Sequence, residues 1–258
     1  MSASLTIAEK DLKEVFNSVS IYGPMIGVPV FFAIILPILT FYVAEYAAPS
    51  IASKLINIPQ GAISQGSLRS IGFMLFFSIN VLGPVFLTMP IITASVIAAD
   101  SFAGEKERKT SEALLSMPIK TRDLMLGKIL SSLIPATLIT LLVFATSGLI
   151  TDYFSHKFFG VNILPNLEWI LMLLTSPFLA LATIGLVVIV SSHVKGVKEA
   201  QQISTLLILP ILIMPFASIF GFARLSVEFF AYVIGALGIL DLVIITLAIN
   251  KFKKENIL

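Results

Sequence analysis

Residues 70–99 read SIGFMLFFSINVLGPVFLTMPIITASVIAA, a run of thirty residues without a single aspartate, glutamate, lysine or arginine. A helix needs about 20 apolar residues to cross a hydrocarbon core about 30 Å thick. Because this run is longer than one crossing requires, we expect it to tilt, kink or extend beyond the bilayer. Its uninterrupted apolar character favours a helix over a barrel strand, in which hydrophobicity alternates over about ten residues.

Five further stretches have the same character, and together the six predict an all-α, polytopic protein with a single transmembrane domain over residues 1–258. The predicted spans are residues 24–43, 70–99, 129–151, 169–192, 200–223 and 229–250. The composition agrees with this prediction, since 57% of the residues are hydrophobic, 12% are charged and the mean hydropathy is +1.00. A soluble domain carries about 25% charged residues. The composition therefore excludes an ordinary soluble enzyme, and the absence of cysteine excludes a disulfide scaffold.

The distribution of basic residues predicts how the chain crosses the membrane. If the N-terminus lies in the cytoplasm, thirteen lysines and arginines fall in cytoplasmic segments and four in outer segments. This bias follows the positive-inside rule. We therefore expect a multi-pass plasma membrane protein with both termini in the cytoplasm. A net charge of +2 is too balanced to suggest a nucleic-acid partner.

Residues 1–23 predict an amphipathic helix that lies in the cytoplasmic interface before the first span. Thr6 and Glu9 have the spacing of a capping box, in which each side chain satisfies a free backbone amide of the other residue. The apolar side of this helix would consist of Ala8, Leu12, Val15, Phe16 and Val19. The alternative interpretation is an N-terminal extension whose only role is solubility.

Residues 102–118, between the second and third spans, combine many charges with one apolar edge. Glu105 and Lys109 have opposite charges four residues apart, a spacing that stabilises a helix. Pro118 is expected to end that helix. The mostly apolar edge consists of Thr110, Ala113, Leu114 and Met117. We expect a short charged helix on the cytoplasmic face, suited to binding a partner; the alternative is an ordinary solvated helix with local salt bridges.

The same segment resembles the cytoplasmic signature of the permease subunits of type-2 ATP-binding-cassette (ABC-2) transporters. The sequence FAGEKER at residues 102–108 matches the acidic and basic start of that signature, and Lys109 stands where the family usually has glycine. The remaining matches are Thr110, Glu112, Leu114, Leu115, Pro118, Gly127 and Lys128. The likeness covers the whole plan of the chain, from the interfacial helix through six spans.

The resemblance implies the permease half of an ATP-driven exporter that works by alternating access. Its coupling helix, residues 102–118, would bind a separate cytoplasmic ATPase subunit, and a second permease copy would complete a homodimer or heterodimer in the lipid bilayer. The implied docking residues are Glu105, Glu107, Arg108, Thr110, Glu112, Leu114 and Met117. The chain itself would be no enzyme, because Gly127-Lys128 lacks the glycine-rich loop that holds phosphates. ATP and magnesium would bind to the partner, and neither a catalytic set nor a metal site is visible in the sequence.

Two polar residues within the spans are candidates for a substrate or ion pathway. Asp241 lies ten residues before Lys251, about 15 Å from the cytoplasmic end of its helix. A carboxylate at this depth costs about 2.5–3.5 kcal/mol on insertion scales. It is either a cation, proton or substrate contact, or it forms a hydrogen bond to a neighbouring helix. Asn80 is a milder candidate of the same kind.

The alternative function is a self-contained ion-coupled carrier centred on Asp241. A third possible function is that of a membrane subunit that transports nothing.

Overall fold

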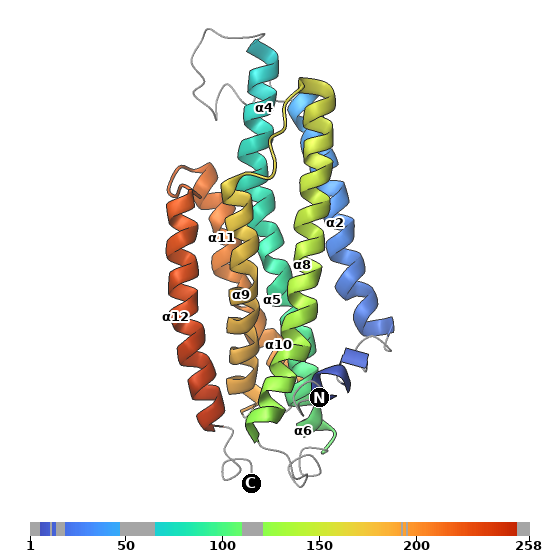
Figure 1. Cartoon of the computed structure of the whole chain (residues 1–258), viewed down its shortest axis with the longest axis vertical. Coiled ribbons are helices and arrows are strands. Elements are labelled where there is room, and N and C mark those ends of the chain that lie inside the picture. Colours follow the sequence, from blue (N-terminus) through green and yellow to red (C-terminus); the bar gives the residue numbers. More distant parts are fainter. Residues whose placement is uncertain are drawn as a thin grey trace.

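The computed structural model describes residues 6–10, 12–13, 19–46, 65–109, 121–191, 193–194 and 196–251. The regular elements within these ranges are all helical, and the long ones run side by side as a bundle (Figure 1). In chain order they are α2 (Val19–Tyr46), α4 (Gln65–Phe77), η1 (Ser78–Leu82), α5 (Gly83–Ala99), η2 (Asp100–Gly104), α6 (Glu105–Glu107), α8 (Thr121–Phe159), α9 (Leu167–Ser191), α10 (Val197–Thr205), α11 (Ile208–Ile219) and α12 (Val227–Lys251).

Six helical stretches of the described chain are long and apolar enough to cross a membrane, which confirms the predicted all-α, polytopic fold. They are Met25–Tyr46, Ser70–Glu107, Asp123–Phe159, Leu167–Ser191, Val197–Ile219 and Val227–Ile244. Each overlaps one of the predicted apolar runs. The second and third stretches are the longest, at 38 and 37 residues. At a rise of about 1.5 Å per residue, both exceed the thickness of the hydrocarbon core.

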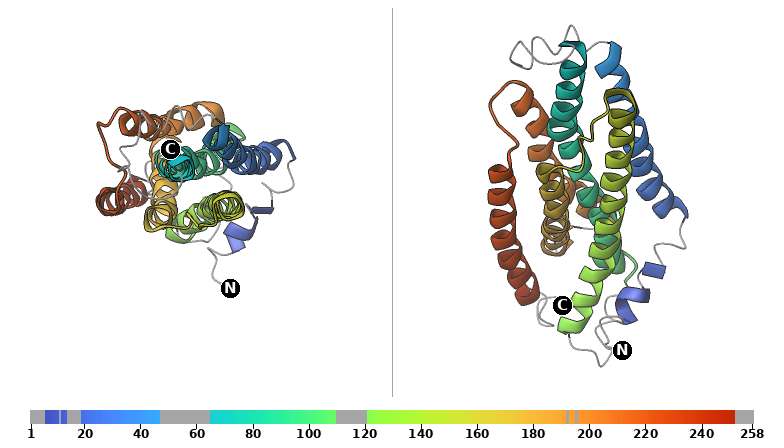
Figure 2. Two further views of the ribbon diagram at one scale, coloured as in Figure 1. Left: turned by 90° about the horizontal axis from the view of Figure 1, so that it is seen from above. Right: turned by 45° about the horizontal axis from the view of Figure 1, so that its top comes forward.

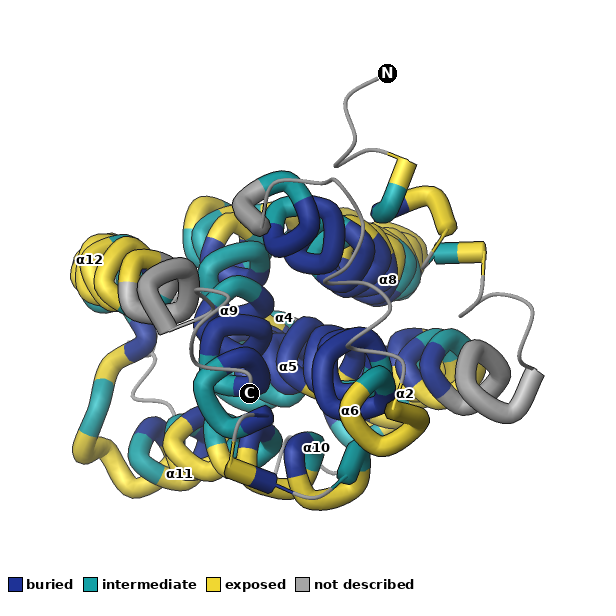
Figure 3. Tube along the Cα trace, turned by 90° about the horizontal axis from the view of Figure 1, so that it is seen from below, coloured by how far each residue is buried: buried dark blue, intermediate teal, exposed yellow. Residues whose placement is uncertain are grey.

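The second span, Ser70–Glu107, lies at the centre of the bundle. Of its most apolar stretch 78% is buried, against 11% for the sixth span, Val227–Ile244. Its main element, α5, packs against α8, α9 and α11, whereas α12 packs mainly against α9. Figure 3 shows α5 dark blue in the middle of the bundle and α12 mostly yellow at its edge. Aromatic rings hold this centre together: the Phe144 ring lies 5.9 Å from that of Phe86 and 4.8 Å from that of Trp169, between centroids.

Two π-helical turns, η1 and η2, interrupt the second span. Such turns are rare and occur frequently at functional sites. In η1 the Asn80 side-chain amide donates a hydrogen bond to the Phe76 carbonyl at 2.9 Å, and its oxygen accepts one from the Ser218 hydroxyl of α11. Asn80 therefore stabilises the irregular turn and links the second span to the fifth.

The fifth span is also irregular, because it consists of α10 and α11 separated by a turn at Leu206 and Leu207. Pro210 has no backbone amide, so it cannot donate the helical hydrogen bond to the Leu206 carbonyl. The helix ends at Ile219, earlier than the predicted residue 223. Gly221 follows with φ of +76°, a left-handed conformation that favours glycine and turns the chain toward α12.

The described residues near the N-terminus lie at the same end of the bundle as α6 and the end of α12 (Figure 1). Residues 6–10 and 12–13 are helical, Ala8 is buried, and Lys13 donates to Glu9 at 2.7 Å. This contact lowers the pKa of the Glu9 carboxyl. The other residues of the predicted interfacial helix before Val19 lie outside the described residues. From Val19 onward the chain belongs to α2, of which Met25–Tyr46 is long and apolar enough to cross a membrane, close to the predicted start at residue 24.

Candidate functional site

Residues 100–109, which we call the junction segment, form the end of the second span and the turn that follows it. The helix continues through η2 and α6 and ends in a turn at Arg108 and Lys109. Lys109 has φ of +56°, a left-handed conformation that is costly for residues other than glycine. Glycine would adopt this conformation without steric cost.

This turn corrects part of the sequence-based prediction. Residues 102–107 are not the beginning of a separate helix but the end of the second span. The predicted ion pair between Glu105 and Lys109 is not formed, because the helix ends before Lys109 and the Glu105 carboxylate pairs with Lys128 instead. Residues 110–118 of the predicted coupling helix lie outside the described residues.

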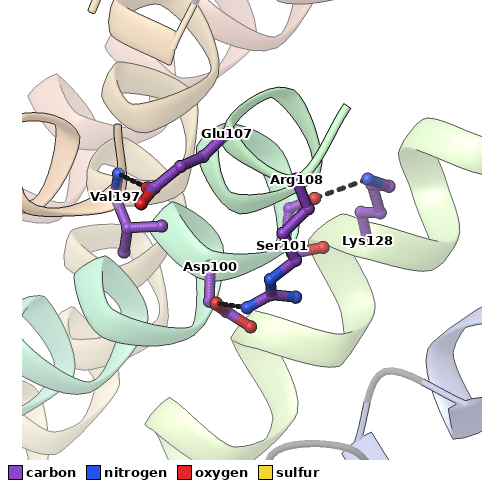
Figure 4. Close-up of polar contacts among 6 residues, drawn as sticks. All are labelled: Asp100, Ser101, Glu107, Arg108, Lys128 and Val197. Carbon is purple, nitrogen blue, oxygen red and sulfur yellow. Dashed lines mark hydrogen bonds and ion pairs between the residues drawn. The ribbon is translucent and has the colours of Figure 1, made fainter. Parts of the chain in front are cut away.

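Lys128, near the start of α8, is the first contact between the junction segment and another span. Its side chain is 2% exposed. The ammonium donates to the Ser101 carbonyl at 2.6 Å and to the Glu105 carboxylate, and it lies 5.0 Å from the centroid of the Phe102 ring. Figure 4 shows Lys128 reaching from α8 to Ser101. A buried charge is costly unless it is paired and hydrogen-bonded. The ammonium therefore holds α8 firmly against the junction segment.

Glu107 makes the second contact, with the beginning of α10. Its carboxylate accepts a hydrogen bond from the Val197 backbone amide at 3.0 Å (Figure 4). The residue before α10, Gly196, has no side chain that could cap the helix, so Glu107 supplies the cap from another helix. A Cβ atom at position 196 would lie 2.8 Å from a Glu107 carboxylate oxygen. Glycine at 196 therefore leaves the space that this contact requires.

Lys106 makes the third contact, with the end of α9. Its ammonium donates to the Ser191 carbonyl at 3.4 Å and to the Val194 carbonyl at 3.2 Å. A cation is favourable there, because the last carbonyls of a helix carry partial negative charge. Within the junction segment itself, Arg108 pairs with Asp100 at 2.5 Å. The segment is thus stabilised by an ion pair of its own and joined to three other helices.

The predicted docking residues divide into two groups. Glu105, Glu107 and Arg108 all lie in the junction segment, where the three side chains contact the chain itself. The Glu107 and Arg108 residues remain exposed, so part of each surface is still accessible. The other predicted docking residues, Thr110, Glu112, Leu114 and Met117, lie outside the described residues.

The two predicted pathway residues lie on different spans, Asn80 on the second and Asp241 on the sixth. Asp241 is 4% exposed although α12 is the most exposed span, and neither carboxylate oxygen has a hydrogen-bond partner within the described part of the chain. The hydrogen bond to a neighbouring helix that one interpretation required is therefore not observed there. Asn80 does make such a bond, to Ser218, and also lines a cavity. No group of three or more His, Asp or Glu side chains within the described residues is arranged to hold a metal ion.

Sequence reasoning did not assign a role to Lys128 or Lys106. A signal for Lys128 is present in the sequence: it shares one helical face with apolar and small residues, a pattern typical of a buried face. The buried residues of that face are Leu124, Met125, Lys128, Ser131 and Ser132. Its partner Glu105 is 23 residues away in the chain, a separation at which no helical spacing pairs two side chains.

Fold and site together define a polytopic helical membrane protein whose central span ends in a charged segment joined to three other helices. Residues 5–251 match the model of a family described as ABC-2 family transporter protein, and the chain belongs to that family. A search of curated proteins found no match. ABC-2 proteins form the membrane-spanning part of ABC transporters and associate with ABC ATPases. The chain is therefore a multi-pass ABC transporter permease, whose family is not itself catalytic.

Proposed function

We propose that this permease is the membrane half of an ATP-driven exporter in the plasma membrane, with both termini in the cytoplasm. Cytoplasmic ATPase subunits bind residues 102–118, and two permease copies move substrate by alternating access. The observation that supports this mechanism best is the set of contacts between the junction segment and the bundle. Lys128, Glu107 and Lys106 join the segment to α8, α10 and α9, respectively.

These contacts determine what a force on the segment would do. A partner that pushes a loosely attached loop would move only that loop. Because the junction segment is continuous with the central span and bonded to three other helices, a displacement of a few ångströms moves the ends of several spans together. The excess of basic residues at the same membrane face supports its assignment to the cytoplasm.

The direct test is the ATPase activity of the purified complex reconstituted in lipid. Glu112→Ala is expected to abolish stimulation of the ATPase by the permease, while detergent-solubilised variant and parent keep the same melting temperature. Glu45→Ala is the matched control, because Glu45 is an exposed acid at the other end of the bundle. Unchanged stimulation in Glu112→Ala, or copurification of the permease without any ATPase, would refute the docking proposal.

Asp241 supports a second candidate function, the ion-coupled carrier. A buried carboxylate without a hydrogen-bond partner within the described residues is the expected state of a site that takes up a cation or proton during transport. This function requires transport into vesicles without ATP, driven by an ion gradient and abolished in Asp241→Asn. Transport that depends on ATP and is unaffected by Asp241→Asn would exclude it.

A further inference from the structure

A cavity of about 400 Å³ lies in the half of the bundle away from α6. Three parts of the chain line it: the residues around η1, the first turn of α9, and the end of α11 with the turn that follows. Figure 2 shows the turn between α11 and α12 beside the beginning of α9. The polar lining residues are Asn80, Glu168, Ser218, Arg224 and Ser226. The volume falls within the range of about 300–1,000 Å³ that is usual for small-molecule sites.

Two opposite charges line this cavity without pairing. Neither the Glu168 carboxylate nor the Arg224 guanidinium forms a hydrogen bond or ion pair with another described residue. The cap of α9 does not use Glu168, because Asn166 accepts the bond from the Trp169 amide at 2.9 Å. One negative and one positive group therefore remain available to a ligand that carries the complementary pair of charges.

With Asp100 taken as the cytoplasmic boundary of the hydrocarbon core, the cavity falls near the opposite boundary, at the level of lipid headgroups. Asp100 is the first charged residue after the apolar run of the second span, and Asn80 lies twenty residues before it. At about 1.5 Å per residue the two are about 30 Å apart, which is one hydrocarbon thickness. In Figure 1 the turn between α11 and α12 lies below the upper ends of α4 and α8. The turn that lines the cavity therefore lies short of the upper ends of these helices, within reach of membrane lipid.

Two exposed phenylalanines lie next to a lining residue of the cavity in the chain. Phe220 and Phe222 flank the lining residue Gly221 and are 70% and 85% exposed. Phenylalanine side chains this exposed at headgroup depth lie against acyl chains rather than water. We propose that the cavity binds a zwitterionic amphiphile: Glu168 receives its ammonium, Arg224 its phosphate, and the acyl chain lies on Phe220 and Phe222. This site goes beyond the proposed ATPase coupling and does not depend on it.

The test uses the single tryptophan, Trp169, which follows Glu168 in the chain. Permease in a non-ionic detergent is titrated with a short-chain lysophosphatidylethanolamine while tryptophan fluorescence is recorded. We expect a saturable change, with affinity lowered at least tenfold in Arg224→Gln and in Glu168→Gln. Arg224→Lys should retain most of the affinity. Glu45→Gln and Lys157→Gln, at exposed residues of α2 and α8, are the matched controls and should bind like the parent. Melting temperatures verify that each variant is folded.

Two further ligands test separately the need for an acyl chain and the need for both charges. Glycerophosphoethanolamine carries the same headgroup without a chain, and lysophosphatidylglycerol carries only the negative charge. We expect both to bind at least tenfold more weakly than the zwitterionic lysolipid. Equal binding of the chain-free headgroup would identify a soluble zwitterion as the ligand and overturn the amphiphile assignment. Equal binding of the anionic lysolipid, or unchanged affinity in folded Glu168→Gln, would overturn the charge pairing. Because no ATPase is present, these outcomes are independent of the coupling experiment.

Discussion

Replacing Glu105 by glutamine is expected to destabilise the protein more than replacing Lys128 by methionine. The reason is the unequal burial of the two side chains, which are 18% and 2% exposed. Glu105→Gln removes a paired carboxylate from a buried ammonium. Lys128→Met leaves a carboxylate that is still in contact with solvent, and methionine fills most of the volume of the lysine chain.

The magnitude follows from the partners that remain. Breaking a buried ion pair by removing one member costs about 3–5 kcal/mol. In Glu105→Gln the ammonium keeps the Ser101 carbonyl and the Phe102 ring, so we expect a loss of about 3 kcal/mol, at the lower end of that range. Lys128→Met is expected to lose about 1 kcal/mol, because replacing buried ionic groups by apolar ones of similar volume is often close to neutral.

The assay is equilibrium unfolding of the purified protein in mixed micelles of mild and denaturing detergent, followed by far-ultraviolet circular dichroism. The double variant Glu105→Gln/Lys128→Met completes the cycle and should be more stable than Glu105→Gln alone. Glu45→Gln, an exposed acid on α2, is the control and should change stability by less than about 0.5 kcal/mol. Equal losses in the two single variants, or a double variant less stable than Glu105→Gln, would refute the buried-pair reasoning.

Three other substitutions test separate features by the same unfolding assay. Lys109→Gly should raise the unfolding free energy by about 0.5–1 kcal/mol, because glycine adopts the observed φ of +56° without steric cost, whereas no gain is expected for Lys109→Ala. Gly185→Ala should lose about 1–3 kcal/mol, because the new Cβ would lie 2.0 Å from the Ile244 side chain; Gly235→Ala, with open space around it, should lose nothing. Asp241→Leu should gain about 1–3 kcal/mol by removing a buried carboxylate without an observed partner, and a loss would reveal a structural partner.

The spans could be predicted from sequence because each depends on a local property, an uninterrupted apolar run. The interruptions of these helices could not be predicted in the same way. Pro210 explains the division of the fifth span, but prolines also lie inside continuous helices here, as Pro135 does in α8. Whether a proline breaks a helix depends on the packing around it, which the local sequence does not contain.

For the candidate site, too, only part could be predicted from the sequence. The charged character of residues 102–109 was evident from sequence, but their pairing was not. Helical spacing predicted Glu105 with Lys109, whereas the structure pairs Glu105 with Lys128 and gives Lys109 a left-handed turn. The pairing depends on how α8 packs against the second span, and this long-range contact overrides the local preference. Likewise, the charges of Glu168 and Arg224 lie 56 residues apart in the chain, and only the fold brings them to one cavity.

The most direct test of the account measures whether motion passes through the junction segment. Because the natural chain has no cysteine, Tyr153 of α8 and Tyr232 of α12, both exposed, can be replaced by cysteine and spin-labelled without background. Pulsed electron paramagnetic resonance then gives the distance between the labels in the reconstituted complex, with and without ATP. We expect ATP to shift this distance in the parent. In Lys128→Met, which removes the contact with α8 but none of the proposed docking residues, the shift should be reduced while the ATPase stays bound and active. An unchanged shift in Lys128→Met, or one that is absent from the parent, would contradict transmission through this contact.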